Sequence, residues 1–319
     1  MKQIFTFGNY LRDKFGCKVY KVGINISGFT CPNIDGTVAK GGCTFCENDS
    51  FSASSGKTQE LKGFYLNLNS TTNPYLEQQL KQLEFQFNTI SNRQKNEYGA
   101  EKFLVYFQSF TNTYAPLDTL KALYEKALTF EGVIGLSIGT RSDSITEETL
   151  EYLVELSKTK EIWIEFGIQS VYNETLQKIN RGHTSENVKE WVLKAKGRGL
   201  NVCGHLIFGL PDETKEMMLQ TAKEAYSWGI DSVKYHPLYI VKKTALANDF
   251  LKGVFTPITE DDYLEVLTKA LLLKPDYVSV QRVTAGIDDD TLLSPQWCRD
   301  KNKQIKKINR ALRAYGLKY

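Results

Sequence analysis

The chain has 319 residues, of which 41% are hydrophobic, 12% aromatic and 24% charged, and its formal net charge is +3. This composition is typical of a globular protein and excludes disordered, collagen-like and fibrous classes, while the small net charge argues against a histone-like binder. The length suffices for one large α/β domain or two average ones. No apolar run of about 18 residues and no secretory signal are present, so we expect a cytoplasmic protein without a membrane partner.

Segments rich in β-branched and aromatic residues alternate along the chain with segments that carry helical caps. The first kind predicts six strands, at Val19–Ser27, Phe103–Ser109, Val133–Gly139, Ile162–Ile168, Asn201–Phe208 and Ser232–Tyr239. The second kind predicts five helices, at Pro74–Lys95, Pro116–Thr129, Thr146–Lys158, Thr184–Gly199 and Glu213–Trp228. Strand–helix alternation favours right-handed βα units around a parallel sheet, which is either a partial barrel or a doubly wound sheet.

The long segment Gly28–Thr72, between the first strand and the first of these helices, contains three of the six cysteines, Cys31, Cys43 and Cys46. Six cysteines are too few for a disulfide scaffold of this size, and in a reduced setting clustered cysteines are more often metal ligands or catalytic thiols. The C-x-x-C pair lets two thiolates converge, and glycines in the preceding turn let the chain fold back so that Cys31 joins them.

Three interpretations of this cysteine pattern are open. A structural zinc site needs a fourth ligand, and no further Cys or His is nearby in the sequence. A thioredoxin-like redox pair leaves the third cysteine unexplained. A three-cysteine iron–sulfur cluster leaves one iron free to bind a substrate or cofactor. Among the isolated cysteines, we expect Cys203 to be a small buried side chain, while Cys17 is unassigned and Cys298 is a minor alternative for a fourth ligand or a catalytic thiol.

Six ordered blocks of the sequence resemble the radical S-adenosylmethionine (SAM) superfamily over nearly the whole chain. They are CPNIDGTVAKGGCTFC, YFQSFTNTYAP, LSIGTRSDS, EFGIQS followed by INRGHT, HLIFGLPDET and VKYHPLYIVKKTALA. The resemblance is strongest to the YhcC-like branch, which is related to the Elongator catalytic subunit and includes MnmL-type enzymes of the tRNA wobble uridine. Eleven residues separate Cys31 from Cys43, where three are usual in the superfamily, and this branch resembles the longer form.

The resemblance implies an α/β fold, a partial (β/α)6 TIM-like barrel with terminal extensions. We therefore expect an N-terminal extension at 1–18, the core barrel at 19–255 and a C-terminal helical extension at 256–319 that is basic at its end. The resemblance further implies that Cys31, Cys43 and Cys46 hold a [4Fe–4S] cluster whose unique iron binds the amino and carboxylate groups of SAM. An electron from a low-potential donor of the flavodoxin or ferredoxin type then cleaves SAM to methionine and a 5′-deoxyadenosyl radical, which abstracts a hydrogen atom from the substrate.

The resemblance also implies cofactor contacts at successive strand ends. Phe45 is expected near the adenine, Gln169 near the ribose and Arg181 at the SAM carboxylate, which a guanidinium can bind with two hydrogen bonds. Taken singly, each has a structural alternative, such as a strand-end cap for Gln169 or a surface ion pair for Arg181. The other expected cofactor residues are Gln108 and Ser109, which replace a Gly-Gly turn of the relatives, and Thr140, Arg141, His205, Ile207 and Gly209. Two residues, Lys234 and His236, are expected to face the substrate.

The charge is unevenly distributed along the chain. The first 21 residues carry +4 and the last 21 carry +7, which leaves −8 for the residues between them. In the last segment Ile305, Ile308 and Leu312 recur at helical spacing among cations, which predicts an amphipathic basic helix. Such a helix is either simply solvated or a phosphate-contacting surface.

Together with the resemblance, the basic helix favours tRNA as the substrate. The expected reaction converts the carboxymethylaminomethyl side chain of the wobble uridine to aminomethyl. Two alternatives remain: a radical SAM enzyme that acts on a small molecule or a protein, and a non-enzymatic zinc protein that binds RNA.

Overall fold

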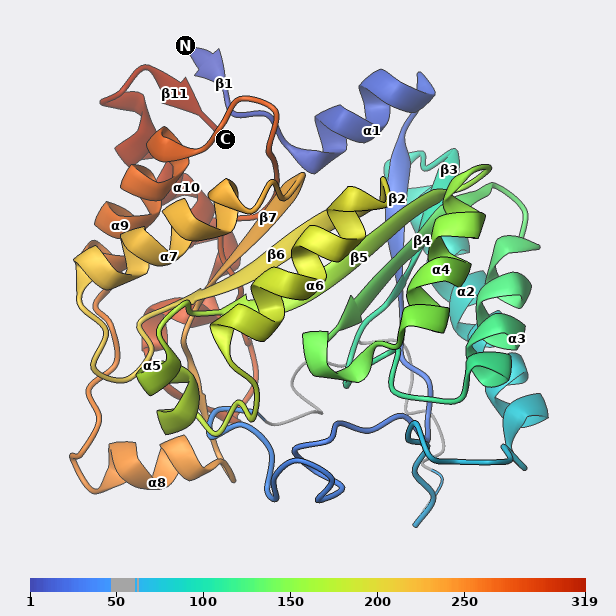
Figure 1. Ribbon diagram of the computed structural model, residues 1–319. Coiled ribbons are helices and arrows are strands. Elements are labelled where there is room, and N and C mark those ends of the chain that lie inside the picture. Colours follow the sequence, from blue (N-terminus) through green and yellow to red (C-terminus); the bar gives the residue numbers. More distant parts are fainter. Residues whose placement is uncertain (47–60, 62) are drawn as a thin grey trace.

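The computed structural model describes residues 1–46, 61 and 63–319 and shows a curled parallel sheet with helices on its outer side (Figure 1). All six predicted strands are present, and a further strand joins them in the order β2-β3-β4-β5-β6-β7-β9. Every neighbouring pair in this sheet is parallel. The first six strands are β2 (Val19–Ile24), β3 (Lys102–Phe107), β4 (Val133–Thr140), β5 (Glu161–Gln169), β6 (Asn201–Phe208) and β7 (Ser232–Pro237). Because β2 and β9 are edges of the sheet, the predicted partial barrel is confirmed.

The strand that the sequence did not predict is β9 (Ser279–Arg282), which lies within the segment predicted as a helical extension. Its four residues include one buried hydrophobic side chain, Val280, so it has no recognisable period-two pattern. β9 is held by β7 on one side and by the N-terminal residues on the other, where the Val280 amide donates to the Phe5 carbonyl at 2.9 Å.

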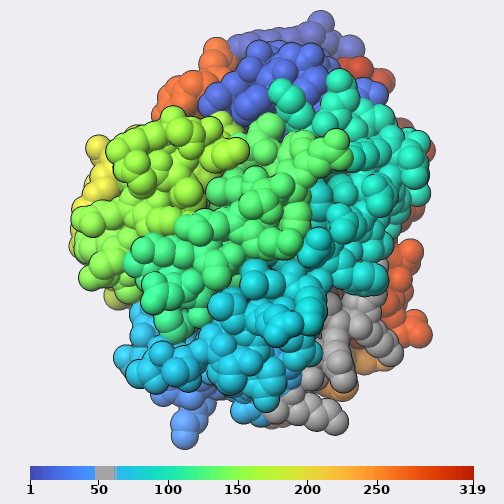
Figure 2. Space-filling view, turned by 90° about the vertical axis from the view of Figure 1, so that its right-hand side faces the viewer, coloured from blue at the N-terminus to red at the C-terminus, as the bar shows by residue number. Residues whose placement is uncertain are grey.

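Helices cover the outer face of the sheet, and Figure 2 shows the flank that α2, α3 and α4 form (cyan to green). The five predicted helices are α2 (Leu76–Tyr98), α3 (Leu117–Leu128), α4 (Glu147–Ser157), α6 (Ser185–Gly197) and α7 (Lys215–Ser227). Thr146, Thr184 and Thr214 each cap a helix by accepting a hydrogen bond from the backbone N–H three residues later, as sequence signals of helix starts predict. Further helices are α5 (Asn173–Lys178), α8 (Ala245–Leu251) and α9 (Glu260–Leu273), besides α1 (Phe7–Phe15) and α10 (Lys301–Arg313) near the chain ends. No helix in the described part of the chain is long and apolar enough to cross a membrane.

The amino ends of the strands are closed by α1 (Phe7–Phe15). The Phe7 ring meets Trp163 of β5 edge-on, with 4.9 Å between the ring centroids, and packs in the same apolar cluster as Leu11 and Cys203. Cys203 has no exposed surface, which confirms the prediction of a small buried side chain. Apolar packing thus fills the barrel beneath α1, while a second hollow opens beside α1, between β2 and β9.

The two chain ends meet beside α1. β1 (Lys2–Gln3) pairs in parallel with β11 (Leu317–Lys318), directly after α10 (Lys301–Arg313). α10 is the predicted amphipathic basic helix, since Ile308 and Leu312 are buried while its cations face outward. A second small pair, β8 (Ile240–Val241) with β10 (Leu292–Ser294), lies near the carboxyl end of β7.

Candidate active site

A cavity of about 430 Å³ opens at the carboxyl ends of the strands. Residues of the cysteine segment form one side of it, and the ends of β3 to β7, β9 and the start of α10 form the rest. All but one of the residues expected at the site line this cavity: Cys31, Cys43, Phe45, Cys46, Gln108, Ser109, Thr140, Arg141, Gln169, Arg181, His205, Ile207, Lys234 and His236.

Gly209 is the expected residue that does not line the cavity. It forms the turn after β6 with φ of +93°, and a Cβ there would lie 2.7 Å from the Ile258 side chain. Its amide approaches the sulfur of Met218 at 3.1 Å. The close packing of this turn against Ile258 therefore explains the glycine at position 209, and the sequence block does not reveal this contact.

The cysteine segment is anchored to the turn that follows α5. Asn33 donates from Nδ2 to the carbonyls of Asn180 (2.5 Å) and Arg181 (2.9 Å), and Asn180 donates to the Gly42 carbonyl at 2.7 Å. The same Asn33 amide lies 3.7 Å from the Cys43 sulfur. These bonds fix a segment that has almost no secondary structure and hold its cysteines at the cavity. The cysteines also stand beside cationic Arg181, whose Nη1 is 3.7 Å from the Cys43 sulfur.

Arg181 and Gln169 present polar atoms that have no partner. Among the described residues, the buried Gln169 Oε1 and Arg181 Nε form no hydrogen bond. Such buried orphan groups are rare and costly, so a ligand that satisfies them is expected. Gly167 makes room for both side chains, because a Cβ at this position would lie 2.5 Å from Arg181 Nη2 and 2.8 Å from Gln169 Nε2.

Two strand ends carry strained backbone at the cavity. Ser109 after β3 has φ of 62° and Gln169 at the end of β5 has φ of 65°, both in the left-handed region that disfavours side chains. Ser109 thus adopts the conformation that the Gly-Gly turn of the relatives would favour. Unusual backbone of this kind clusters at ligand-binding sites.

Thr140 and Arg141, at the end of β4, are largely engaged by the protein. The Thr140 hydroxyl lies 2.5 Å from that of Thr113. Arg141 donates two hydrogen bonds to Asp143, at 2.6 and 2.8 Å, and one to the Arg181 carbonyl at 2.7 Å. Burial disfavours the charged guanidinium, but these bonds to Asp143 and the nearby Cys31 together raise its pKa. Arg141 therefore supports the position of Arg181.

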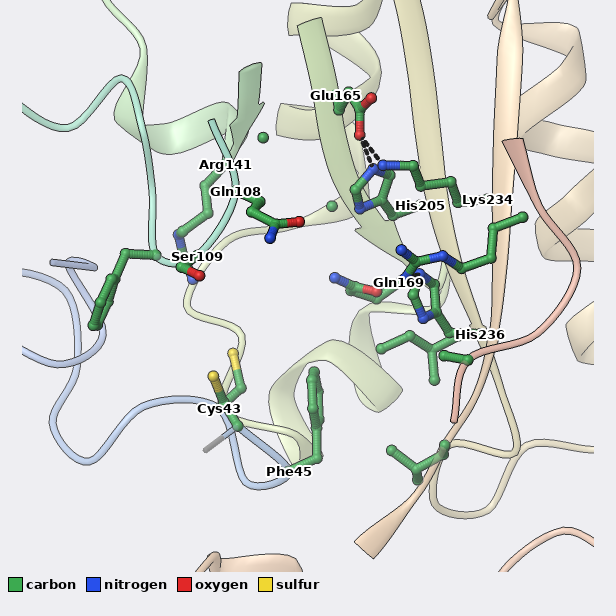
Figure 3. A pocket seen from close by; sticks show the side chains of 18 of the residues that line it. Cys43, Phe45, Gln108, Ser109, Arg141, Glu165, Gln169, His205, Lys234 and His236 are labelled. Carbon is green, nitrogen blue, oxygen red and sulfur yellow. Dashed lines mark hydrogen bonds and ion pairs between the residues drawn. The ribbon is translucent and has the colours of Figure 1, made fainter. Parts of the chain in front are cut away.

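The depth of the cavity holds a charged network centred on Glu165, which has no exposed surface (Figure 3). Glu165 forms ion pairs with Lys21 and Lys234, and its Oε2 lies 2.7 Å from Nε2 of His205. Burial alone would raise the pKa of Glu165, but the two lysines hold it well below the usual range. Burial lowers the pKa of Lys21 to about 8 and that of His205 to about 4.

The protonation state of His205 follows from this network. With its pKa near 4, the imidazole is neutral at neutral pH, and an ionised carboxylate only accepts hydrogen bonds. His205 therefore donates its Nε2–H to Glu165. His236 is also neutral, because burial and the neighbouring Arg282 hold its pKa well below the usual range.

The sequence prediction missed Tyr106, Glu165 and Arg282 as cavity residues. Glu165 could have been found, since it lies two and four residues before Gly167 and Gln169 and so shares their face of β5. Arg282 belongs to the unpredicted β9 and carries no such signal. Cys298, the minor alternative for a ligand, is fully buried and does not line the cavity.

The donors on the cysteine side fit a [4Fe–4S] cluster with SAM. Three cysteines leave one iron of a cluster open, and the orphaned Gln169 Oε1 and Arg181 Nε supply an acceptor and a cationic donor for a polar ligand beside it. Phe45, which is 8% exposed, offers an aromatic face at the same end of the cavity (Figure 3).

Comparison with known proteins identifies the family. Residues 36–225 match the model of the Radical SAM superfamily, and residues 230–314 match that of the Radical_SAM C-terminal domain. The chain is 35% identical to the uncharacterized protein YtqA of Bacillus subtilis, over 99% of this chain and 91% of that protein. It is 32% identical to protein YhcC of Escherichia coli, over 99% of this chain and 94% of that protein.

Two further similarities are more distant. A tRNA uridine(34) acetyltransferase of Methanocaldococcus infernus is 31% identical over 157 residues, which are 48% of this chain and 29% of that protein. The solved structure of the archaeal Elp3 from Methanocaldococcus infernus shares the fold, with a TM-score of 0.62 and 19% identity over 93% of this chain and 64% of that one. Of the three interpretations of the cysteine pattern, the family match favours the iron–sulfur cluster. The chain belongs to the radical SAM superfamily, in its YhcC-like branch, and its cofactors are a [4Fe–4S] cluster and SAM.

Proposed function

We propose that this radical SAM enzyme modifies tRNA and converts the carboxymethylaminomethyl side chain of the wobble uridine to aminomethyl. The observation that supports tRNA most directly is the similarity to a tRNA uridine(34) acetyltransferase over 157 residues. The specific conversion rests on the resemblance to MnmL-type enzymes. A wobble base lies in a single-stranded loop, where proteins can splay a base out and take it into a pocket.

The chain's own residues then position the cofactors and the substrate in the cavity. When bound and reduced by a low-potential donor of the flavodoxin or ferredoxin type, the cluster and SAM would supply the radical that removes a hydrogen atom from the substrate. Loss of one further electron to the oxidised cluster and addition of water would then release the carboxymethyl unit as glyoxylate and leave the aminomethyl group. Cys31, Cys43 and Cys46 hold the cluster. Arg181 binds the SAM carboxylate and Gln169 accepts from a ribose hydroxyl, which satisfies the two orphaned atoms. The hydrophobic wall of Phe45 and Ile207 excludes water from the adenosine side.

The basic helix α10 supports a nucleic-acid substrate. Its first residue, Lys301, lines the cavity, so the helix begins at the site of chemistry. Besides Lys301, four of its cations are exposed: Lys303, Lys306, Arg310 and Arg313. If these four contact phosphates, the logarithm of the association constant falls with the logarithm of the salt concentration with a slope of about −3.

The nucleosides of a deletion strain test the function. Loss of the gene should raise carboxymethylaminomethyluridine in total tRNA and remove aminomethyluridine and nucleosides made from it, as measured by mass spectrometry. A plasmid copy should restore the profile, and a Cys43→Ala copy should not. An unchanged profile would refute the tRNA substrate and favour a small-molecule or protein substrate for the same cavity.

A further inference from the structure

The cavity has a second cationic wall, away from the cysteines, at the end of β9. Arg282 is the last residue of β9 and lines the cavity together with Lys301 at the start of α10. Lys21 and Lys234 share the carboxylate of Glu165, and Arg141 has that of Asp143. In contrast, no Asp or Glu in the described ranges forms an ion pair with Arg282 or Lys301. This wall therefore carries positive charge that the protein itself does not neutralise.

The pKa values of the groups around Arg282 reflect the same excess of positive charge. Its charge contributes to lowering the pKa of Lys234, of Lys301 and of His236, in each case after burial. His236 is neutral, and its Nε2 lies 3.5 Å from Nη1 of Arg282, so the imidazole accepts from the guanidinium and restrains its orientation. The other guanidinium N–H groups donate to no acceptor among the described residues. A half-buried guanidinium beside an exposed ammonium group, with no counter-ion among the described residues, favours an anionic ligand.

We propose that Arg282, oriented by His236 and assisted by Lys301, forms a carboxylate-binding subsite that receives the carboxymethyl carboxylate of the substrate side chain. This assignment rests on the proposed function. Figure 3 shows His236 across the cavity from Cys43, so an anion bound beside His236 lies away from the side that holds the cluster. A guanidinium matches a carboxylate with two parallel hydrogen bonds, which fixes the orientation as well as the position of the ligand.

The subsite explains how substrate and product are told apart. The substrate side chain carries a carboxylate, whereas the aminomethyl product carries only an ammonium group at neutral pH. The cationic wall attracts the carboxylate of the substrate and repels the ammonium group of the product. Attraction and repulsion therefore both discriminate between substrate and product. The wall therefore favours substrate binding and product release. A backbone phosphate is a less suitable ligand for this position, because the wall lies in the same cavity as the cofactor residues.

Binding of the free nucleosides to SAM-loaded anaerobic holoenzyme tests the subsite. We expect wild type to bind carboxymethylaminomethyluridine about 10- to 100-fold more tightly than aminomethyluridine, as one charge-assisted contact provides. Arg282→Gln should abolish this preference, Arg282→Lys should retain part of it, and Arg12→Gln should retain all of it, since Arg12 is exposed on α1 at the closed end of the barrel. Acetate should compete with the first nucleoside more strongly than inorganic phosphate.

The outcomes separate this inference from the proposed function. The subsite is refuted if wild type shows no preference for the carboxylate nucleoside, if Arg282→Gln keeps the preference, or if phosphate competes better than acetate. If the Arg282 variants do not fold, the relative affinity of the wild type for the two nucleosides alone tests the subsite. If wild type shows the preference and Arg282→Gln loses it, while tRNA is not converted in a parallel turnover assay, the subsite stands and the proposed tRNA reaction fails. If both proteins convert tRNA equally well, the reaction stands and the subsite fails.

Discussion

Glu165→Gln removes the one buried carboxylate that two lysines share. The substitution keeps the volume of the side chain, but the single amide oxygen replaces only one carboxylate oxygen, so it accepts either from Ser137 Oγ, 2.5 Å from Glu165 Oε1, or from His205 Nε2, 2.7 Å from Oε2. It leaves Lys21 and Lys234 without a counter-ion in a site where the latter is 4% exposed. Removing one partner of a buried ion pair lowers the free energy of unfolding by about 3–5 kcal/mol. At about 2 °C per kcal/mol, the melting temperature should fall by roughly 6–10 °C at pH 7.

The pH dependence gives this prediction a distinctive sign. The pKa of Lys21 is already lowered to about 8 in the folded protein, and Glu165 is the main group that holds it up against burial. In the variant the pKa falls further below the unfolded value of about 10.5. Because the unfolded state then binds more protons, the free energy of unfolding rises with pH, and in the variant this rise begins below pH 8 instead of near it.

The assay is anaerobic thermal melting of the holoenzyme at pH 6, 7, 8 and 9. The difference in melting temperature between wild type and Glu165→Gln should shrink as the pH rises. A Lys21→Met/Glu165→Gln double variant, which removes one of the two stranded ammonium groups, should recover part of the loss. A variant that melts within about 2 °C of wild type at pH 7, with no dependence of the difference on pH, would refute the assignment of a charged buried network.

Three further predictions concern the cluster ligands, the position of Arg181 and the buried carboxyl group of Glu213, which accepts from Ser170 outside the cavity. Cys43→Ala should remove the visible absorption of the cluster and reductant-dependent SAM cleavage, whereas Cys203→Ala should keep about four irons per chain, because Cys203 lies in the apolar packing beneath α1. Gly167→Ala should displace the Arg181 guanidinium and lower SAM affinity about tenfold in equilibrium dialysis, with little change in melting temperature; unchanged affinity would contradict the role of Arg181. Burial raises the pKa of Glu213 to about 7, so ionisation of this group should destabilise the wild type as pH rises from about 5 to 8, and Glu213→Gln should flatten that slope in urea titrations.

The sequence predicted those parts of the fold that depend on repeated patterns. In β5, Ile162, Ile164, Phe166 and Ile168 all pack against the outer helices, so this strand was evident as a run of large apolar residues. Thr146 and Thr184 likewise marked helix starts. β9 has no such pattern, since its register comes from pairing with β7 and from the N-terminal residues beside Val280. These are contacts between distant parts of the chain, which no local signal encodes.

The site could be predicted where residue types and their spacing in the sequence define the chemistry. It could be predicted less well where the three-dimensional placement of the side chains defines it. The cysteine triad follows from the C-x-x-C pair and its glycine-rich approach. Gly209 shared a block with cavity residues, but its backbone faces Ile258 instead. Arg282 entered only with the three-dimensional structure, because its importance lies in the absence of an acidic partner among the described residues.

Transfer of a labelled hydrogen atom tests the central claim most directly. Reduced, SAM-loaded enzyme should be incubated with tRNA whose wobble uridine carries deuterium at both methylene groups of the carboxymethylaminomethyl side chain. We predict that 5′-deoxyadenosine accumulates with one deuterium, in step with the appearance of the aminomethyl nucleoside. Unlabelled 5′-deoxyadenosine together with unchanged tRNA would contradict the claim that this side chain is the substrate.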